Sequence, residues 1–122
     1  MCLAVSNRIR KLKQLGILEG TCYKLNAEKI GQDYVVISTV TCSSQGSEQE
    51  KIANTIAKFD GVMSVYMLFG TSDILLIARR KDKSSAKQLV YNVSRIPGVG
   101  STTTMVPHTV IKESLAVDPF QR

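Results

Sequence analysis

The sequence has few of the residues that build metal centres and catalytic sites. It contains one histidine, no tryptophan and three cysteines, and Cys2, Cys22 and Cys42 are widely spaced without a C-x-x-C pair. Such spacing indicates neither a zinc site nor a disulfide framework, so we expect reduced thiols and no metal. His108 has no motif-like partner, and the sequence has no glycine-rich phosphate-binding loop. We therefore expect no cofactor, no catalytic residue and a protein that is not an enzyme.

Long apolar runs are also missing. None approaches the roughly 18 residues that a membrane span needs, and the apolar start at residues 1–5 is too short for a signal-peptide core. These features predict a cytoplasmic protein without membrane contact.

Acidic residues are scarce at one end of the chain. The net charge is +6, and residues 1–24 hold five basic side chains against Glu19 alone. Such asymmetry favours a polyanion partner at the N-terminal end, although a short basic run is also typical of a solvated helix face.

With 43% hydrophobic residues, the chain is able to bury the core of one domain. Its most apolar stretch, residues 62–80, consists of two runs separated by Gly70-Thr71-Ser72-Asp73, which predicts a β-hairpin. The second run, residues 74–78, is apolar at every position, so both faces of that strand should be covered. Taken alone, the four separating residues are typical of a surface turn.

Residues 6–16 are expected to form a helix that ends at a glycine C-cap, Gly16. Val5, Ile9 and Leu12 recur at the i, i+4, i+7 spacing of one apolar stripe, and polar and basic residues cover the other face. A DNA-recognition helix needs this arrangement, because Asn and Arg read base edges and Lys and Arg neutralise phosphates. The candidate DNA-binding residues are Ser6, Asn7, Arg8, Arg10, Lys11 and Lys13; the alternative is an ordinary amphipathic surface helix.

An extended connector and a single helical turn over residues 27–31 should follow. We therefore divide the chain into residues 1–32, a helix with its linker, and residues 33–122, the main domain.

The main domain shows one pattern twice. Residues 34–41 are rich in β-branched residues and predict a strand; a helix with a Ser47/Glu50 capping box and an end at Gly61 should follow. After the hairpin, Ser84 or Ser85 should cap a second helix, stopped by Pro97-Gly98, and a last strand begins near Val99. Strand-helix-strand twice predicts an α+β, ferredoxin-like βαββαβ fold with both helices on one sheet face. The other face would be apolar and bare, so a second subunit should cover it.

Three motifs in this order resemble the Lrp/AsnC, or feast/famine, transcriptional regulators. Residues 5–18 are similar to the family's recognition helix and its R-I-x-x-L-x-x-x-G-[IV]-[IL] pattern. Residues 70–73 resemble the G-x-x-D hairpin of the family's sensing module, called RAM. Residues 96–104 resemble the [LI]-P-G-V-x-x-T-x-T motif that opens its last strand. The resemblance implies that residues 33–122 are a RAM domain for ligand binding and oligomerisation.

The resemblance also implies a small effector, usually an amino acid, bound between dimers that assemble into a ring, here an octamer. Asp73 would meet the effector's ammonium, and backbone N–H groups and hydroxyls would meet its carboxylate. The implied effector-binding residues are Gly70, Thr71, Ser72, Asp73, Thr102 and Thr104.

The sequence departs from the family pattern at its start. Family members carry some tens of residues before the recognition helix, whereas at most Met1 to Ala4 precede it here. Either the start is misassigned or the regulator is trimmed to its sensor, and DNA affinity should be weakened or lost if the helix-turn-helix is truncated. Two alternatives follow: a stand-alone sensor or hetero-oligomer modulator without its own DNA binding, and, less favoured, a small dimeric ferredoxin-like enzyme. The enzyme would need an enclosed acid-base pair, and the sequence shows none.

Overall fold

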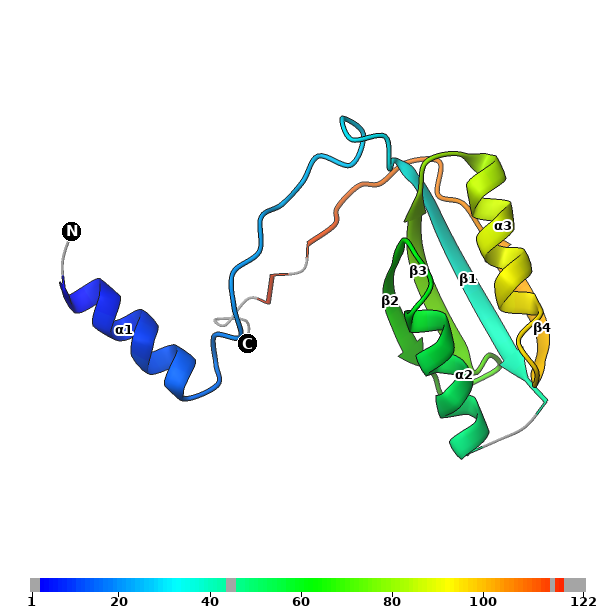
Figure 1. The fold of residues 1–122 in the computed structure, drawn as a ribbon, viewed down its shortest axis with the longest axis horizontal. Helices are drawn as coiled ribbons and strands as arrows, with labels where there is room; N and C mark the ends of the chain where they lie inside the picture. Colours follow the sequence, from blue (N-terminus) through cyan, green and yellow to red (C-terminus); the bar gives the residue numbers. More distant parts are fainter. Residues whose placement is uncertain (1–2, 44–45, 115, 118–122) are drawn as a thin grey trace.

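The computed structural model describes residues 3–43, 46–114, 116 and 117, and its fold is α+β (Figure 1). Within these described residues, one helix comes first, and two further helices alternate with four strands. The elements are α1 (Leu3–Gln14), β1 (Tyr34–Cys42), α2 (Ser47–Ala57), β2 (Val62–Met67), β3 (Ile74–Arg80), α3 (Lys83–Ser94) and β4 (Val99–Met105). No helix among the described residues is long and apolar enough to cross a membrane.

The four strands form one antiparallel sheet in the order β2-β3-β1-β4. Strand β1 is central, with β3 on one side and β4 on the other. Helices α2 and α3 both lie on one face of this sheet (Figure 1). The predicted ferredoxin-like βαββαβ order is therefore confirmed.

The hydrophobic core lies between the sheet and these two helices. Successive side chains of a strand point to opposite faces, and the register pairs Val36 with Ala78 and Val40 with Ile74 on the helix-facing side. Ile56 of α2 and Leu89 of α3 complete this layer and are buried. The predicted apolar stripes of both helices therefore supply the core.

Several predicted helix boundaries were wrong: α1 begins at Leu3 rather than at residue 6, α3 ends at Ser94 before Pro97, and both later helices begin differently from the prediction. Helix α2 is preceded by Gly46, and no side chain caps it, because Ser47 already lies inside the helix. The same helix ends at Ala57, before Gly61. Helix α3 is capped by Asp82, whose carboxylate accepts the Ser85 N–H at 2.8 Å, because Asp82 has the extended backbone of an N-cap.

Gly61 instead brings two backbones together. Its φ is +85°, and a Cβ built there would lie 2.4 Å from the Arg79 carbonyl oxygen. The Arg79 N–H donates to the Gly61 carbonyl at 2.9 Å, so the chain approaches β3 too closely for any side chain.

Helix α1 stands apart from the sheet, at the end of an extended segment (Figure 1). Its C-terminal end is closed as predicted: Gly16 has φ +76°, and the Ile17 N–H donates to the Leu12 carbonyl at 2.9 Å. The predicted turn over residues 27–31 also forms, with the Asn26 side chain accepting the Lys29 N–H at 3.1 Å.

Candidate functional site

The sheet face opposite the helices is apolar and partly open. Ile37, Leu75 and Ile77 are half-buried on this open face, and Tyr66 and Met105 beside them are 54% and 50% exposed. The C-terminal segment reaches the same face, where Glu113 forms an ion pair with Arg79. The open face has the apolar character that the sequence predicted for it.

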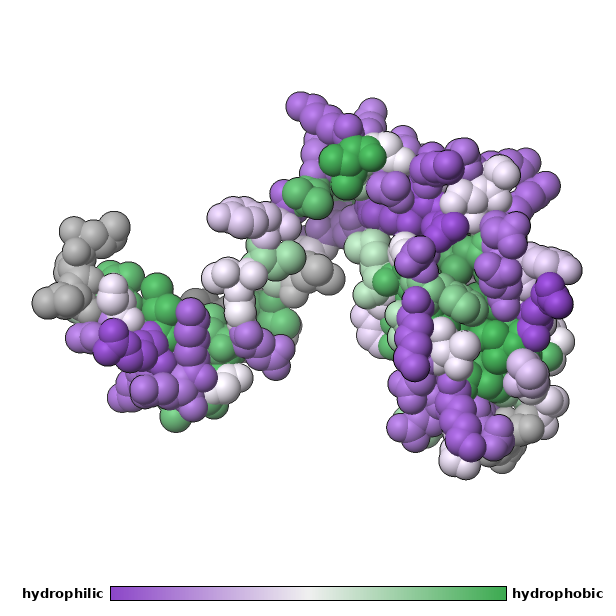
Figure 2. All heavy atoms as spheres, viewed as in Figure 1, coloured by the Kyte–Doolittle hydropathy of each residue, from purple (hydrophilic) through white to green (hydrophobic). Residues whose placement is uncertain are grey.

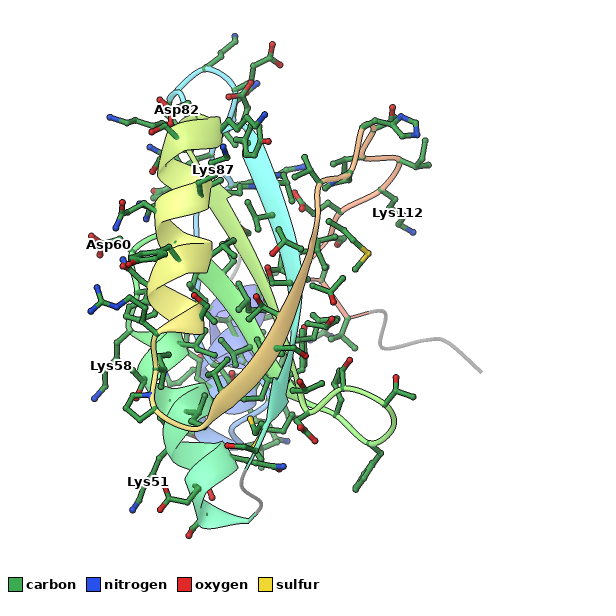
Figure 3. All side chains as sticks on the ribbon, turned by 90° about the vertical axis from the view of Figure 1, so that its right-hand side faces the viewer. Lys51, Lys58, Asp60, Asp82, Lys87 and Lys112 are labelled. Carbon is green, nitrogen blue, oxygen red and sulfur yellow. The ribbon has the colours of Figure 1, made fainter. Side chains whose placement is uncertain are left out.

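The turn between β2 and β3, residues 68–73, lies at one end of the sheet and projects on the side away from the helices (Figure 3). The Leu68 N–H donates to the Asp73 carbonyl at 2.8 Å, and the Asp73 N–H donates to the Val40 carbonyl at 2.9 Å. Gly70, with φ +128°, supplies a conformation that other residues rarely adopt. Phe69 is fully exposed beside it. The turn is thus anchored at its base and open at its tip.

Asp73 is half-buried and fastens this turn to β1. Its Oδ2 accepts the Cys42 backbone N–H at 2.7 Å, while Oδ1 makes no hydrogen bond to the described residues. Burial and then the Asp73 charge raise the pKa of the Cys42 thiol. Asp73 is therefore not a free side chain on the turn, because its carboxylate is hydrogen-bonded to the end of the neighbouring strand.

The other predicted effector-binding residues of the turn remain accessible. Gly70 and Thr71 are exposed, and Ser72 is half-buried. Exposed backbone N–H groups, a hydroxyl and a partly free carboxylate are able to bind a small zwitterion.

Thr102 and Thr104 do not join the turn within one subunit. They pair with Val40 and Ser38 on the β4 side of β1, whereas Asp73 bonds β1 from the β3 side. Both face the helix layer, and the Thr104 hydroxyl lies 2.8 Å from the Ser38 hydroxyl. The structure thus separates the six predicted effector-binding residues into two groups.

Thr102 and Thr104 instead line a groove of about 450 Å³ between α3 and β4. Sequence reasoning missed this groove. The pattern in the sequence that could have indicated it is a second set of residues on one face of α3, which begins at Lys83 and includes Lys87.

The six candidate DNA-binding side chains of α1 are all exposed. Val5 and Ile9, which should seat the helix, are also 45% and 43% exposed. Hydrophobic side chains accordingly reach the surface of α1 and of the segment after it (Figure 2). The polar and basic face of α1 is exposed, as predicted. The apolar stripe of this helix, however, is not buried against the other described residues.

The described chain thus combines a ferredoxin-like sheet with an open apolar face, an exposed polar turn and a basic helix that stands apart from the sheet. The Lrp/AsnC ligand binding domain matches residues 35–117. The chain is also 37% identical over 115 residues to an HTH-type transcriptional regulator of Pyrococcus abyssi, covering 94% of this chain and 77% of that protein. The protein belongs to the Lrp/AsnC family of transcriptional regulators.

Solved structures share this fold. A transcriptional regulator of Neisseria meningitidis in complex with L-methionine superposes with a TM-score of 0.87 at 20% identity, over 95% of this chain and 76% of that one. The Escherichia coli AsnC structure superposes with a TM-score of 0.83 at 18% identity, over 93% of this chain and 76% of that one. A feast or famine regulatory protein of Mycobacterium tuberculosis, also complexed with L-methionine, gives 0.77 at 19% identity, over 95% and 78%.

Proposed function

We propose that this regulator senses an amino acid at a subunit interface that includes the turn Gly70–Asp73. One observation carries the proposal: Asp73 is fixed to β1 through Oδ2, so its charge is held at the base of an exposed turn. Residues 33–122 act as the ligand-binding and oligomerisation domain. The L-methionine complexes of the two regulators with this fold support the choice of effector class.

The chemistry of the turn suits both ends of an amino acid. The ammonium requires an anion, which Asp73 supplies, and a carboxylate requires donors, which Gly70 and Thr71 offer at the exposed tip. Ser72 lies between them. Thr102 and Thr104 do not join this site within one subunit, because β1 separates them from the turn.

Calorimetry with a panel of amino acids tests this assignment. At least one ligand should bind, and Asp73→Asn should weaken it about ten- to a hundredfold, because a hydrogen bond to a charged group contributes about 1.5 to 3 kcal/mol. Asp60→Asn is the matched control, since it removes an exposed charge elsewhere on the same domain. If Asp73→Asn binds every ligand as tightly as the parent, the turn is not the sensor.

The open face explains why a subunit interface is expected. A second copy that covers Tyr66, Ile77 and Met105 would bury apolar surface at a gain of roughly 25 cal/mol per Å², part of which is lost to the costs of association. We expect a dimer, and dimers should assemble further, to an octamer. Light scattering at micromolar concentration that gave the monomer mass of 13.4 kDa would contradict this.

For DNA, we propose that α1 contacts phosphates through Arg8, Arg10, Lys11 and Lys13 and bases through Ser6 and Asn7. The chain should bind DNA weakly and with little sequence preference. The reason is that Val5 and Ile9 are not buried against described residues, so packing does not hold the helix in one orientation. Fluorescence anisotropy at several salt concentrations measures this. A nanomolar, operator-selective complex at physiological salt would show that α1 is seated in solution.

The exposed apolar stripe of α1 equally favours a second function. In this alternative the protein is a sensor or hetero-oligomer modulator that does not bind DNA by itself. The same anisotropy titration separates the two. Alanine at Arg10 and Lys11 should reduce the salt dependence of binding if α1 contacts phosphates. No measurable binding by the parent chain would support the modulator.

A further inference from the structure

The groove between α3 and β4 follows one face of α3 along most of the helix. The α3 residues that line it recur at i, i+3, i+4, i+7, i+8 and i+11, the spacing of one helix face: Lys83, Ala86, Lys87, Val90, Tyr91 and Ser94. At about 1.5 Å per residue, this stripe extends roughly 16 Å along the helix. The groove therefore suits an elongated ligand better than a compact one.

The body of the groove is apolar. Val36 forms part of the floor, and Val90 and Val106 line the sides. The Thr104 hydroxyl in the lining hydrogen-bonds to the hydroxyl of Ser38, a residue that is only 2% exposed. The floor thus has its polar atoms paired, which lowers the cost of covering it with an apolar chain.

Tyr91 lines the groove in the second half of α3, away from Lys83. The Arg95 guanidinium carbon lies 5.4 Å from the centre of the Tyr91 ring, within the range of a cation–π contact. The ring is therefore held by its neighbour on the next turn of the chain.

The charged side chains in the lining itself are both lysines and lie toward one end of α3, whereas Arg95, outside the lining, is held against the Tyr91 ring. Lys83 and Lys87 are one helical turn apart in the first half of α3, and Figure 3 shows Lys87 in the same half of the helix as Asp82. Among the described residues no Asp or Glu lines the groove, and none forms an ion pair with either ammonium. Asp82 is the nearest acid in sequence, and its carboxylate already accepts the Ser85 N–H.

We propose that this groove binds a carboxylic acid with a linear apolar body. Its carboxylate would lie between Lys83 and Lys87, and its chain would follow α3 toward Tyr91. An amino acid fits less well, because its ammonium would stand beside two lysines without a carboxylate in the lining to pair with it. The ligand class is thus the opposite of the one proposed for the turn, where Asp73 requires an ammonium.

Calorimetry with three probes of one chain length tests the proposal: decanoate, decanamide and 2-aminodecanoate, each below the concentration at which it self-associates. Decanoate should bind, and the neutral amide and the zwitterion should bind at least about tenfold more weakly, as expected for loss of a charge-assisted contact. Equal affinities for all three would overturn the proposal, as would the absence of decanoate binding.

Two variants locate the binding. Lys83→Met with Lys87→Met should weaken decanoate binding at least about tenfold. Lys51→Met with Lys58→Met, which removes the same charge from α2 and the residue that caps its C-terminal end, should have no effect. Val90→Trp should fill the groove and abolish binding, with circular dichroism confirming that the domain is folded. Val90 is half-buried, so Val90→Ile serves as a milder second variant that should weaken binding without a folding defect.

The decanoate experiment is independent of the proposed effector site. Asp73→Asn should leave decanoate affinity unchanged, because Asp73 lies across β1 from the groove. Decanoate binding that is lost in Asp73→Asn but retained in the double lysine variant would overturn the groove assignment.

Discussion

Helix α1 and the two helices of the domain carry similar apolar stripes but differ in what covers them. Ile56 and Leu89 are 0% and 2% exposed against the sheet, whereas Val5 and Ile9 remain more than two-fifths exposed. Periodicity thus predicts which face of a helix is apolar but not what packs against it. The stability of most protein helices comes from such packing rather than from helix propensity, so the domain should be a cooperative unit and α1 should fold largely apart from it.

The largest difference is expected from apolar truncations in the two regions. Leu76→Ala, at a side chain that is 1% exposed, should reduce the free energy of unfolding by about 3 kcal/mol, since it leaves a cavity in the core. Ile9→Ala in α1 should change it by less than about 0.5 kcal/mol. Urea unfolding at one fixed protein concentration measures both. Comparable losses would mean that α1 packs against another surface in solution.

Two glycines with the same backbone conformation sharpen the comparison. Gly61→Ala should destabilise the domain by about 2 kcal/mol or more, because its Cβ would collide with the Arg79 carbonyl in addition to straining the backbone. In Gly16→Ala the added Cβ has no atom within 4 Å, so only the strained backbone destabilises the protein, by about 1 kcal/mol and within α1 alone. The first should lower the urea midpoint; the second should appear only as reduced helical circular dichroism.

Asp73 tests how the domain holds its turn. Asp73→Ala should lower the free energy of unfolding by about 1.5 kcal/mol, because it removes a charge-assisted hydrogen bond to the half-buried Cys42 N–H. Asp73→Asn should lower the free energy of unfolding by less, since the amide oxygen is still able to accept the hydrogen bond from the Cys42 N–H. A change of only a few tenths for Asp73→Ala, measured by the same urea method, would return Asp73 to the status of a surface-turn residue.

The smallest effect concerns the two described cysteines. Burial and the Asp73 charge raise the pKa of Cys42, so at neutral pH it should alkylate more slowly than the exposed Cys22, and Asp73→Asn should accelerate it. Peptide mapping after iodoacetamide treatment measures both rates. The sign for stability follows from linkage: above the thiol's ordinary pKa the unfolded state loses its proton first, so the raised pKa of Cys42 should slightly reduce stability as pH rises there. Cys42→Ser should remove this dependence.

Most of the fold was predictable because its signals are local. The β-branched run at residues 34–41, the apolar stripes of α2 and α3 and the separating turn at residues 70–73 each specify an element within a few residues of sequence. The helix starts were less predictable, since Ser47 and Asp82 differ in backbone conformation rather than in capping ability.

The candidate site was predictable only in part. The turn was found because glycine, hydroxyls and a carboxylate interrupt an apolar run. The hydrogen bond that the Cys42 N–H donates to the Asp73 carboxylate joins residues 31 positions apart, and no local pattern contains that pairing. Within one subunit β1 lies between Thr102, Thr104 and the turn, so their grouping in one effector site stays a prediction about a subunit interface.

By itself, the sequence determined the order of helices and strands, the apolar face of each and the basic character of the N-terminal helix, because periodicity and charge are properties of neighbouring residues. Only the tertiary structure decided that the Asp73 carboxylate accepts a hydrogen bond from Cys42, that Lys83 and Lys87 line a largely apolar groove, and that Val5 and Ile9 of α1 stay more than two-fifths exposed. Those features depend on which elements the sheet order places side by side, and that order is set by packing over the whole chain.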